Sequence, residues 1–189
     1  AEGWWTREGR AYIRINSDGL RDREHIKIKP ANTVRIAVLG DSVAEAFQLP
    51  MENTFWSVLE SEMNKCPPIQ PKKLEVINFG VSGYGTAREL LTLRLRVWDY
   101  NPDIVLLAFF TGNDIRNNYK KLEKIEYIPY FYYDGGKLVL DNSFRTSNSF
   151  LAGTGWKGDI RRYLVNSRVV QLLAVINKAR ANEQTATQV

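Results

Sequence analysis

The chain has 189 residues, enough for one ordinary domain, and 44% of them are hydrophobic and 12% aromatic, which indicates a globular protein with a core. Its net charge of +5 comes from 26 Lys and Arg scattered among 21 Asp and Glu, which argues against nucleic-acid binding. A lone Cys66 excludes an internal disulfide and a cysteine-based metal site, and no run of about 18 apolar residues marks a membrane span.

The middle of the chain alternates between apolar strands and amphipathic helices. An apolar run predicts a strand at 34–39, and apolar residues at helical spacing follow at 54–65. A second strand is predicted at 74–80, a second helix at 86–98 and a third strand at 104–110. The third strand has no polar alternation, as in strands covered on both faces. This β-α-β-α-β order predicts an α/β fold with a parallel sheet.

Each predicted helix has an apolar stripe that should face the sheet. In the first helix the stripe consists of Phe55, Val58, Leu59 and Met63. In the second it consists of Leu91, Leu95 and Trp98, with Leu90, Leu93 and Val97 beside it. Three parallel strands would leave 104–110 near an open edge, which folded proteins avoid. We therefore expect further strands, from a longer chain or from a partner molecule.

Residues 1–33 are predicted to form an N-terminal lead-in arm. The arm is irregular, apart from a short strand at 12–15 and a turn at 16–20, where Asn, Asp and Gly occur together. Two adjacent tryptophans, Trp4 and Trp5, are expected to lie on the domain.

The domain itself is predicted to span 34–181, followed by a frayed tail at 182–189. Apolar segments at 125–133 and 137–140 flank Asp134-Gly135-Gly136 and predict a β-hairpin. The hairpin carries a run of aromatic residues that suits packing better than sugar stacking. A loop is predicted at 143–158, and a helix within 159–181 whose apolar face consists of Val169, Leu172, Leu173 and Ile176.

Small polar residues follow each strand of the predicted sheet. They are Gly40-Asp41-Ser42, the glycine-rich segment 78–86, and Thr111-Gly112-Asn113-Asp114. Because parallel sheets bind ligands at the carboxyl ends of their strands, the three clusters should meet in one crevice. Acyl transfer could use Ser42 as nucleophile, because the backbone amides at the start of a helix favour developing negative charge. The amide of Ser42, an amide from the glycine loop and the carboxamide of Asn113 could converge on an oxyanion.

In this order the clusters resemble the sequence blocks of the SGNH hydrolases, also called the GDSL esterase/lipase family. Gly40-Asp41-Ser42-Val43 resembles block I, 78–86 resembles block II, and Gly112-Asn113-Asp114 resembles block III. Residues 15–25 are similar to the lead-in of one bacterial branch of that family. The resemblance implies a flavodoxin-like three-layer α/β/α sandwich with a parallel sheet.

The resemblance also implies roles for individual residues. Ser42 would be the nucleophile, and the oxyanion hole would be formed by Ser42, Gly83 and Asn113. The family's block II glycine lies five residues after its asparagine, which selects Gly83 over Gly80 or Gly85. The implied activity is that of a serine esterase or acyltransferase acting on O-acyl esters of carbohydrate or lipid through an acyl-enzyme. No metal or organic cofactor is implied, and a small-molecule or glycan ester is the expected partner.

The general base is the part of this pattern that the sequence lacks. The family's base is a histidine three residues after an aspartate near the C-terminus, but no histidine follows His25. No convincing parallel strand follows 104–110 either. Both absences predict that the last strands and the Asp-x-x-His block lie outside this sequence. As an alternative, Asp22 and His25 themselves form an Asp-x-x-His.

Structural roles remain open for the three site residues. Ser42 could be a helix N-cap, Asn113 could cap a helix or hold a turn, and Gly83 could serve only to allow a tight turn. A dinucleotide site is rejected because Gly-x-Gly-x-x-Gly does not follow the first strand. A non-catalytic domain that binds a glycan or protein is the second functional hypothesis.

Overall fold

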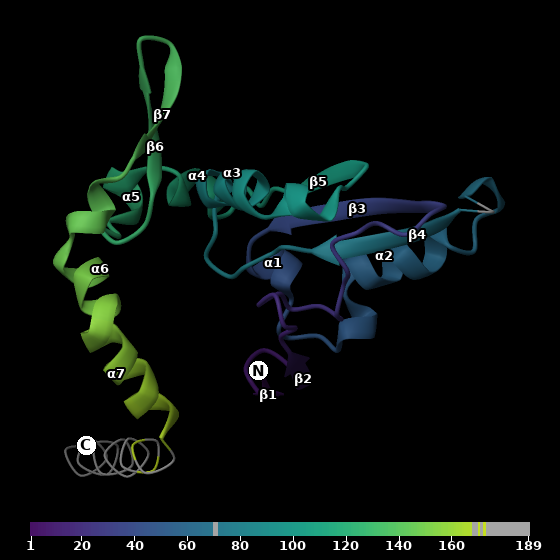
Figure 1. Cartoon of the computed structure of the whole chain (residues 1–189), viewed down its shortest axis with the longest axis horizontal. Coiled ribbons are helices and arrows are strands. Elements are labelled where there is room, and N and C mark those ends of the chain that lie inside the picture. The colour runs from purple at the N-terminus through teal and green to yellow at the C-terminus, as the bar shows by residue number, and fades with distance from the viewer. Residues whose placement is uncertain (70–71, 168–169, 171, 173–189) are drawn as a thin grey trace, which may run out of the picture. The chain divides into compact units, whose positions relative to one another are not determined.

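The computed structural model describes residues 1–69, 72–167, 170 and 172 (Figure 1). The chain divides into two compact units. The first contains Ala1–Lys124 and Tyr130–Leu140, and the second contains Ile125–Pro129 and the chain from Asp141 onward. Because all three predicted site residues lie in the first unit, this unit carries the functional argument.

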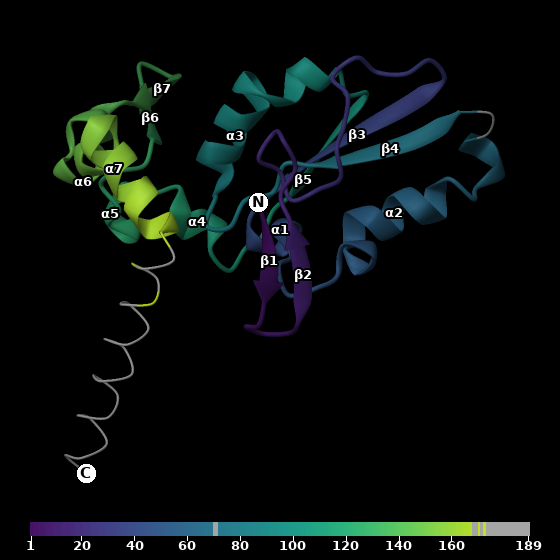
Figure 2. The ribbon, with the colours of Figure 1, turned by 60° about the horizontal axis from the view of Figure 1, so that its bottom comes forward.

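A three-stranded parallel sheet forms the centre of the first unit (Figure 2). The middle strand, β3 (Thr33–Gly40), pairs with β4 (Lys73–Asn78) on one side and with β5 (Ile104–Ala108) on the other. Val38 is in register with both Asn78 and Leu106, so the three carboxyl ends lie at one edge of the sheet. The predicted parallel α/β sheet is confirmed.

Helices cover both faces of β3. On one face, α1 (Ser42–Glu45) and α2 (Phe55–Met63) pack through Ala44 and Trp56 against Val38 and Val76. The other face is covered by α3 (Thr86–Leu95), by the 3₁₀ turn η3 (Val97–Tyr100) and by the lead-in, through a cluster that consists of Leu20, Ala37, Leu39, Ile77, Phe79, Val97 and Tyr100. Two shorter 3₁₀ turns, η1 (Met51–Asn53) and η2 (Pro67–Ile69), flank α2.

The inward face of α2 differs from the predicted stripe. Phe55 and Val58 are 39% and 43% exposed, whereas Trp56 is fully buried. The indole Nε1 of Trp56 donates a hydrogen bond to the carbonyl of Ala44 at 3.0 Å. The helix is therefore turned so that its largest side chain fills the space between α1 and the sheet. Leu59 and Met63 do contact the core, as predicted.

The inward face of the second predicted helix was also wrong in part. Leu95 and Trp98 are exposed, whereas Glu89 and Val97 are buried and Leu93 packs against the core. The α-helix ends at Leu95 and continues as η3, so the helical period changes at this point. Residues beyond the change no longer follow the predicted stripe.

Strand β5 is an edge strand in the described part of the chain. The prediction that its side chains are covered on both faces is wrong. Ile104 and Leu107 are 49% and 45% exposed, and Phe109 and Phe110 beyond the strand are exposed as well. The reason is that β5 pairs with β3 alone, and the described residues provide no element over its other edge.

The lead-in is more regular than predicted. Residues Glu2–Trp5 form β1, which pairs antiparallel with β2 (Ala11–Arg14). The predicted turn at 16–20 is confirmed, because the amide of Gly19 donates to the carbonyl of Asn16 at 3.1 Å and Gly19 has a φ of +77°. Two short helices, α4 (Asp114–Asn117) and α5 (Lys120–Glu123), follow the sheet.

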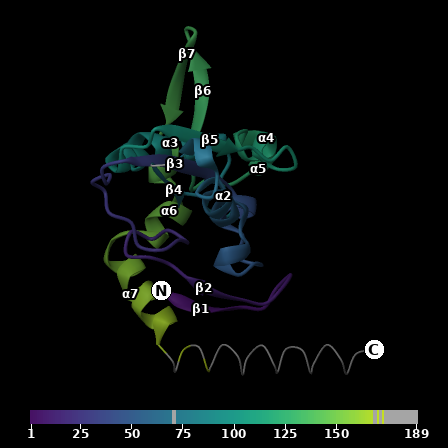
Figure 3. The same ribbon diagram turned by 90° about the vertical axis from the view of Figure 1, so that its right-hand side faces the viewer.

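The predicted hairpin is confirmed as β6 (Tyr130–Asp134) and β7 (Lys137–Asp141), which lie side by side in Figure 3. The expectation that its aromatic residues pack holds for Tyr130, which is buried. It is wrong for Tyr132 and Tyr133, which are exposed. Burial thus decreases along β6, from buried Tyr130 through half-buried Phe131 to the exposed residues before the turn.

The prediction of a loop at 143–158 is wrong. This segment contains the 3₁₀ turn η4 (Ser143–Thr146), α6 (Asn148–Gly153) and the start of α7 (Gly155–Asn166). Ser147 caps α6 by accepting a hydrogen bond from the amide of Phe150 at 3.2 Å, and the left-handed Gly155 separates the two helices. Of the predicted apolar face, Leu172 is exposed, and Val169, Leu173, Ile176 and the tail 182–189 lie outside the described residues.

Candidate active site

Asp41 organises the turn that follows β3. It is fully buried, and its Oδ1 accepts a hydrogen bond from the amide of Val43 at 2.9 Å, which makes Asp41 the N-cap of α1. Ser42 is the first residue of that helix and is exposed. The capping role considered for Ser42 therefore belongs to Asp41, and the Ser42 hydroxyl is left at the surface.

The same aspartate also holds the cluster that follows β5. The carboxamide Nδ2 of Asn113 donates a hydrogen bond to Oδ2 of Asp41 at 2.9 Å. Asn113 occupies the N-cap position of α4, but its side chain makes no capping bond. Instead, the turn is closed by Asp114, whose Oδ2 accepts from the amide of Phe110 at 2.7 Å. Asn113 is thereby turned toward the end of β3.

The glycine-rich segment 78–86 contacts the same turn. The amide of Val81 donates to the carbonyl of Gly40 at 3.0 Å, and Oδ1 of Asn78 accepts from the amide of Gly80 at 3.0 Å. Gly80 lies so close to α1 that a Cβ there would be 2.5 Å from Cβ of Ala44. Only glycine allows this approach of the loop to the helix.

Gly83 lies at the exposed tip of this loop. It has a φ of +78°, in the left-handed region that favours glycine, so the turn role considered for it is observed. The preceding residue, Ser82, is bonded to α1: its amide donates to Oε2 of Glu45 at 2.7 Å, and its hydroxyl donates to the same oxygen. The loop tip is therefore held beside the helix that begins at Ser42.

The segments after β4 and β5 are also joined to each other. Oδ1 of Asn118 accepts from the amide of Ala87 at 2.8 Å, and Nδ2 of Asn118 donates to the hydroxyl of Thr86. A Cβ at Gly85 would be 2.7 Å from Cβ of Asn117. All three strand-end clusters are thus brought together at the carboxyl edge of the sheet, as the parallel order implies.

Three buried carboxyl groups, those of Asp41, Asp114 and Glu89, lie at this junction. Asp41 and Asp114 belong to the predicted clusters, whereas Glu89 was missed in the sequence. Burial, with the charges of Asp114 and Asp41, raises the pKa of Glu89 to about 7. Burial also raises the pKa of Asp114, although the hydrogen bond that its carboxylate accepts from the Phe110 amide lowers it. Within the described residues, neither carboxylate oxygen of Glu89 has a hydrogen-bond partner. The signal that could have indicated Glu89 is its place four residues before Leu93 on the inward face of α3.

His25 lies elsewhere in the fold. Its Nδ1 is 2.8 Å from Oε1 of Glu75, and its Nε2 is 3.2 Å from Oδ2 of Asp22. Burial opposes protonation, but the hydrogen bonds to these two carboxylates raise the pKa of His25 above its usual value. Its side chain is buried, although His25 lies in an irregular part of the lead-in.

The carboxylates around His25 are held by β4. Glu75 is in register with Arg35 within the sheet, and Oδ2 of Asp22, which faces Nε2 of His25, accepts the amide of Asn78 at 2.8 Å. The Arg35 guanidinium donates to Glu75 through Nε at 2.8 Å. Although burial has the opposite effect, the hydrogen bonds from His25 and Arg35 lower the pKa of Glu75 to about 2. The structure therefore does not bring His25 to Ser42.

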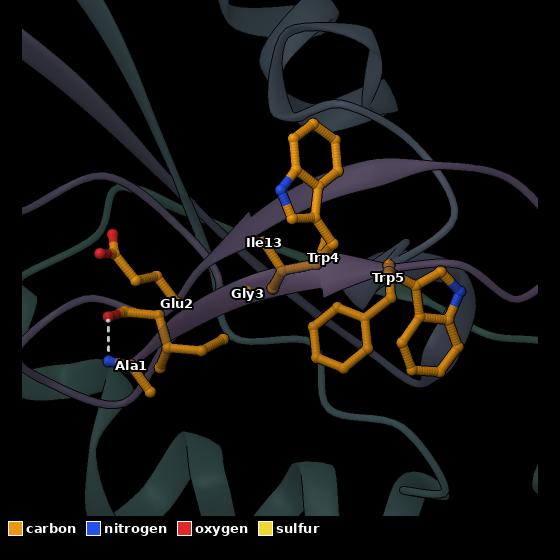
Figure 4. A pocket seen from close by; sticks show the side chains of 8 residues that line it. Ala1, Glu2, Gly3, Trp4, Trp5 and Ile13 are labelled. Atoms are coloured by element: carbon orange, nitrogen blue, oxygen red, sulfur yellow. Dashed lines mark hydrogen bonds between the residues drawn. The ribbon is translucent and has the colours of Figure 1, made fainter.

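An apolar pocket of about 220 Å³ lies between the β1–β2 hairpin and the residues after α1 (Figure 4). Its lining includes Trp5, Ile13 and Phe47, and the rings of Trp5 and Phe47 are 5.2 Å apart. Ser42, Gly83 and Asn113 do not line it, so this pocket is separate from the candidate site.

No protein-family model matches the chain, and no curated protein matches it. Among the described residues, no group of three or more His, Cys, Asp or Glu side chains is placed to hold a metal ion. No helix in the described ranges is long and apolar enough to cross a membrane.

Proposed function

We propose that the protein is a serine ester hydrolase of the SGNH type, with Ser42 as nucleophile. The observation that carries the proposal is the hydrogen bond between Asn113 and Asp41, because it joins the third sequence block to the first directly beside an exposed serine. The resemblance of all three blocks to that family supports the same function. From the same resemblance we propose that the α/β fold is the flavodoxin-like sandwich of that family.

The oxyanion hole would be formed by three N–H donors. The amide of Ser42 is in the first turn of α1, where helices have unsatisfied amides. Asn113 has two N–H groups on Nδ2, and the bond to Asp41 uses one of them. Gly83 supplies the third donor from the loop tip beside α1. Donors fixed before reaction stabilise the developing charge without reorganisation.

The proposed chemistry is acyl transfer in two steps. Oγ of Ser42 attacks the ester carbonyl carbon while a general base removes the hydroxyl proton, and the carbonyl oxygen becomes an oxyanion. The tetrahedral intermediate collapses, the alcohol leaves with that proton, and an acyl-serine remains. Water then attacks the acyl-serine to release the acid, or a second alcohol takes the acyl group. Ser42 and Gly83 are both exposed, which would leave room for an O-acyl ester of a carbohydrate or lipid.

The base is proposed to come from outside these 189 residues. The chain contains one histidine, and both of its ring nitrogens face carboxylates of the lead-in and β4. Without a base the hydroxyl of Ser42 stays protonated near neutral pH, so the chain alone should show weak or no turnover. An Asp-x-x-His in the rest of the protein would complete the triad.

A fluorophosphonate probe tests this function, because it labels only an activated serine. We expect stoichiometric labelling of the full-length protein and its loss in Ser42→Ala. Ser61→Ala, at an exposed serine on α2, is the matched control and should keep the label on Ser42. Labelling that persists in Ser42→Ala would contradict the assignment.

The second candidate is a non-catalytic domain that binds a glycan or protein at the same surface. The engagement of His25 by Glu75 and Asp22 favours it, because it leaves Ser42 without a basic partner among the described residues. A full-length protein that binds an acetylated glycan but is not labelled by the probe would support this second function.

A further inference from the structure

We infer that Glu45 is a positioning residue that fixes the loop tip carrying Gly83 relative to Ser42. This inference rests on the proposed function for its catalytic meaning. Its structural part, the attachment of the loop tip to α1, can be tested separately.

The first step concerns Glu45 itself, which is held firmly. It is 8% exposed and lies three residues after Ser42, in the same short helix. Its amide donates to the carbonyl of Asp41 at 2.9 Å, and its carbonyl accepts from Nη1 of Arg21 at 2.6 Å. Its backbone therefore keeps a fixed place relative to the nucleophile.

The second step concerns the contact between Glu45 and the loop. One carboxylate oxygen, Oε2, accepts both the amide and the hydroxyl of Ser82, and the amide bond is 2.7 Å long. Hydrogen bonds to an ionised carboxylate are about twice as strong as neutral ones. This pair of bonds ties the residue that precedes Gly83 to the helix of Ser42.

The third step concerns what else holds the loop tip. Gly83 is exposed, and no heavy atom lies within 4 Å of the place that its Cβ would occupy. By contrast, Gly80 at the base of the loop is packed directly against Ala44. Packing thus secures the base of the loop. The tip is a turn closed by the amide of Tyr84, which donates to the carbonyl of Val81 at 3.0 Å. The bonds of Ser82 to Glu45 tie this turn to α1. Since an oxyanion donor works only in a fixed place, loss of Glu45 should affect the chemical step.

The experiment measures phosphonate labelling and amide hydrogen exchange in the same variants of the full-length protein. Glu45→Ala should lower the maximal labelling rate by about 100-fold, the effect of losing one oxyanion donor, with probe affinity within about threefold of wild type. Amide exchange in the 81–85 segment should become at least about tenfold faster, which corresponds to the loss of about one hydrogen bond. Glu45→Gln keeps an acceptor oxygen and should restore most of both properties.

Glu60→Ala is the matched control. Oε2 of Glu60 also accepts a backbone amide, that of Val76 at 2.6 Å, but from the middle of β4. This variant should lose stability without a change in labelling of Ser42 or in exchange of 81–85. If Glu45→Ala leaves 81–85 exchange unchanged, or if Glu60→Ala accelerates it equally, the inference is wrong.

The two proposals fail in different ways. If the wild-type protein is not labelled at Ser42, the esterase function fails, while the exchange measurement still decides whether Glu45 holds the loop. If Glu45→Ala accelerates exchange of 81–85 but labels at the wild-type rate, Glu45 has no positioning role and the inference is overturned. If Glu45→Ala does not fold, Glu45→Gln decides the matter. Amide exchange of the 81–85 segment that is clearly faster in Glu45→Gln than in the wild-type protein overturns the inference.

Discussion

Asp41 has two structural tasks at the candidate site. One of its carboxylate oxygens caps α1 and the other accepts the carboxamide of Asn113. A protein that used Ser42 only as a helix cap would have no need of this aspartate, because one capping group is enough. The arrangement instead leaves Ser42 exposed and bonds the Asn113 carboxamide to Asp41, the residue directly before Ser42.

Glu89 makes stability depend on pH. Its pKa is raised to about 7 by burial and by the charges of Asp114 and Asp41, so the folded state holds a proton that the unfolded state releases near pH 4.5. Stability contributed by this group is therefore fully present at low pH and is lost as pH rises through about 7, with a slope of up to about 1.4 kcal/mol per pH unit.

Glu89→Gln removes this titration. We expect the variant to be more stable than wild type by about 1–3 kcal/mol at pH 8, with the difference shrinking toward pH 5, in denaturant unfolding curves. Glu62→Gln, an exposed position on α2, is the control and should leave the pH profile unchanged. A wild-type profile parallel to that of Glu89→Gln would show that Glu89 is ionised in the folded protein.

The sequence indicates the polar clusters at this edge of the sheet, but it does not indicate which charged side chains are buried beside them. The clusters around Ser42 and Asn113 stand out because small polar residues interrupt an apolar pattern at strand ends. The burial of Glu89 and Asp114 is not visible in the same way, because charged residues are usually on the surface. Only the assembled junction shows that they are enclosed.

At the scale of elements, α1 and the loop after β4 depend on their close approach. A Cβ at Gly80 would lie 2.5 Å from Cβ of Ala44 and 2.9 Å from the amide nitrogen of Glu45. Neither neighbour can move freely, because Ala44 belongs to the core and the Glu45 amide belongs to α1.

Gly80→Ala should therefore destabilise the protein by about 1–3 kcal/mol, the usual cost of overpacking. It should also reduce labelling of Ser42, because the loop has to move away from α1. Gly153→Ala on α6 meets open space and should change stability by less than about 1 kcal/mol. Unfolding midpoints of both variants check this, and equal midpoints would disprove the close approach.

Elements were predicted well where one physical signal dominates. The strands of the sheet are continuous apolar runs, and the hairpin at 130–141 has a glycine turn, so both were found. The orientation of α2 was not, because burial of Trp56 depends on its hydrogen bond to Ala44. The strand β1 was missed because its Glu2-Gly3-Trp4-Trp5 sequence has no strand pattern until β2 pairs with it.

At the scale of the first unit, a buried ionic network joins the lead-in to the sheet. Glu75 contacts His25 and Arg35, and the Arg35 guanidinium also donates to the carbonyls of Ile26 and Lys27. Because these segments are far apart in the sequence, neither composition nor periodicity could indicate the pairing. The network explains why the histidine is a structural residue here.

Glu75→Gln should cost about 3 kcal/mol at pH 6, because it leaves the buried Arg35 guanidinium without its anion and leaves His25 with Asp22 alone. The lowered pKa of Glu75, about 2, means that its contribution is present above pH 4.5 and is lost as pH falls toward 2. The raised pKa of His25 means that its contribution is present at low pH and is lost as pH rises through that pKa.

The stability difference between wild type and Glu75→Gln should therefore be greatest between about pH 4.5 and 6.5. Denaturant unfolding across this range checks the prediction. Asp99→Asn breaks the exposed pair with Lys27 and should cost less than about 1 kcal/mol at every pH. A flat difference between wild type and Glu75→Gln would disprove the network's ionic character.

The most direct test of the account is a crystal structure of the full-length protein after reaction with a phosphonate. The phosphonyl oxygen of the adduct occupies the place of the oxyanion. We predict a covalent bond to Oγ of Ser42, with that oxygen about 2.7–3.1 Å from the amides of Ser42 and Gly83 and from Nδ2 of Asn113. An adduct on another residue, or an oxygen that contacts none of these donors, would contradict the proposed active site.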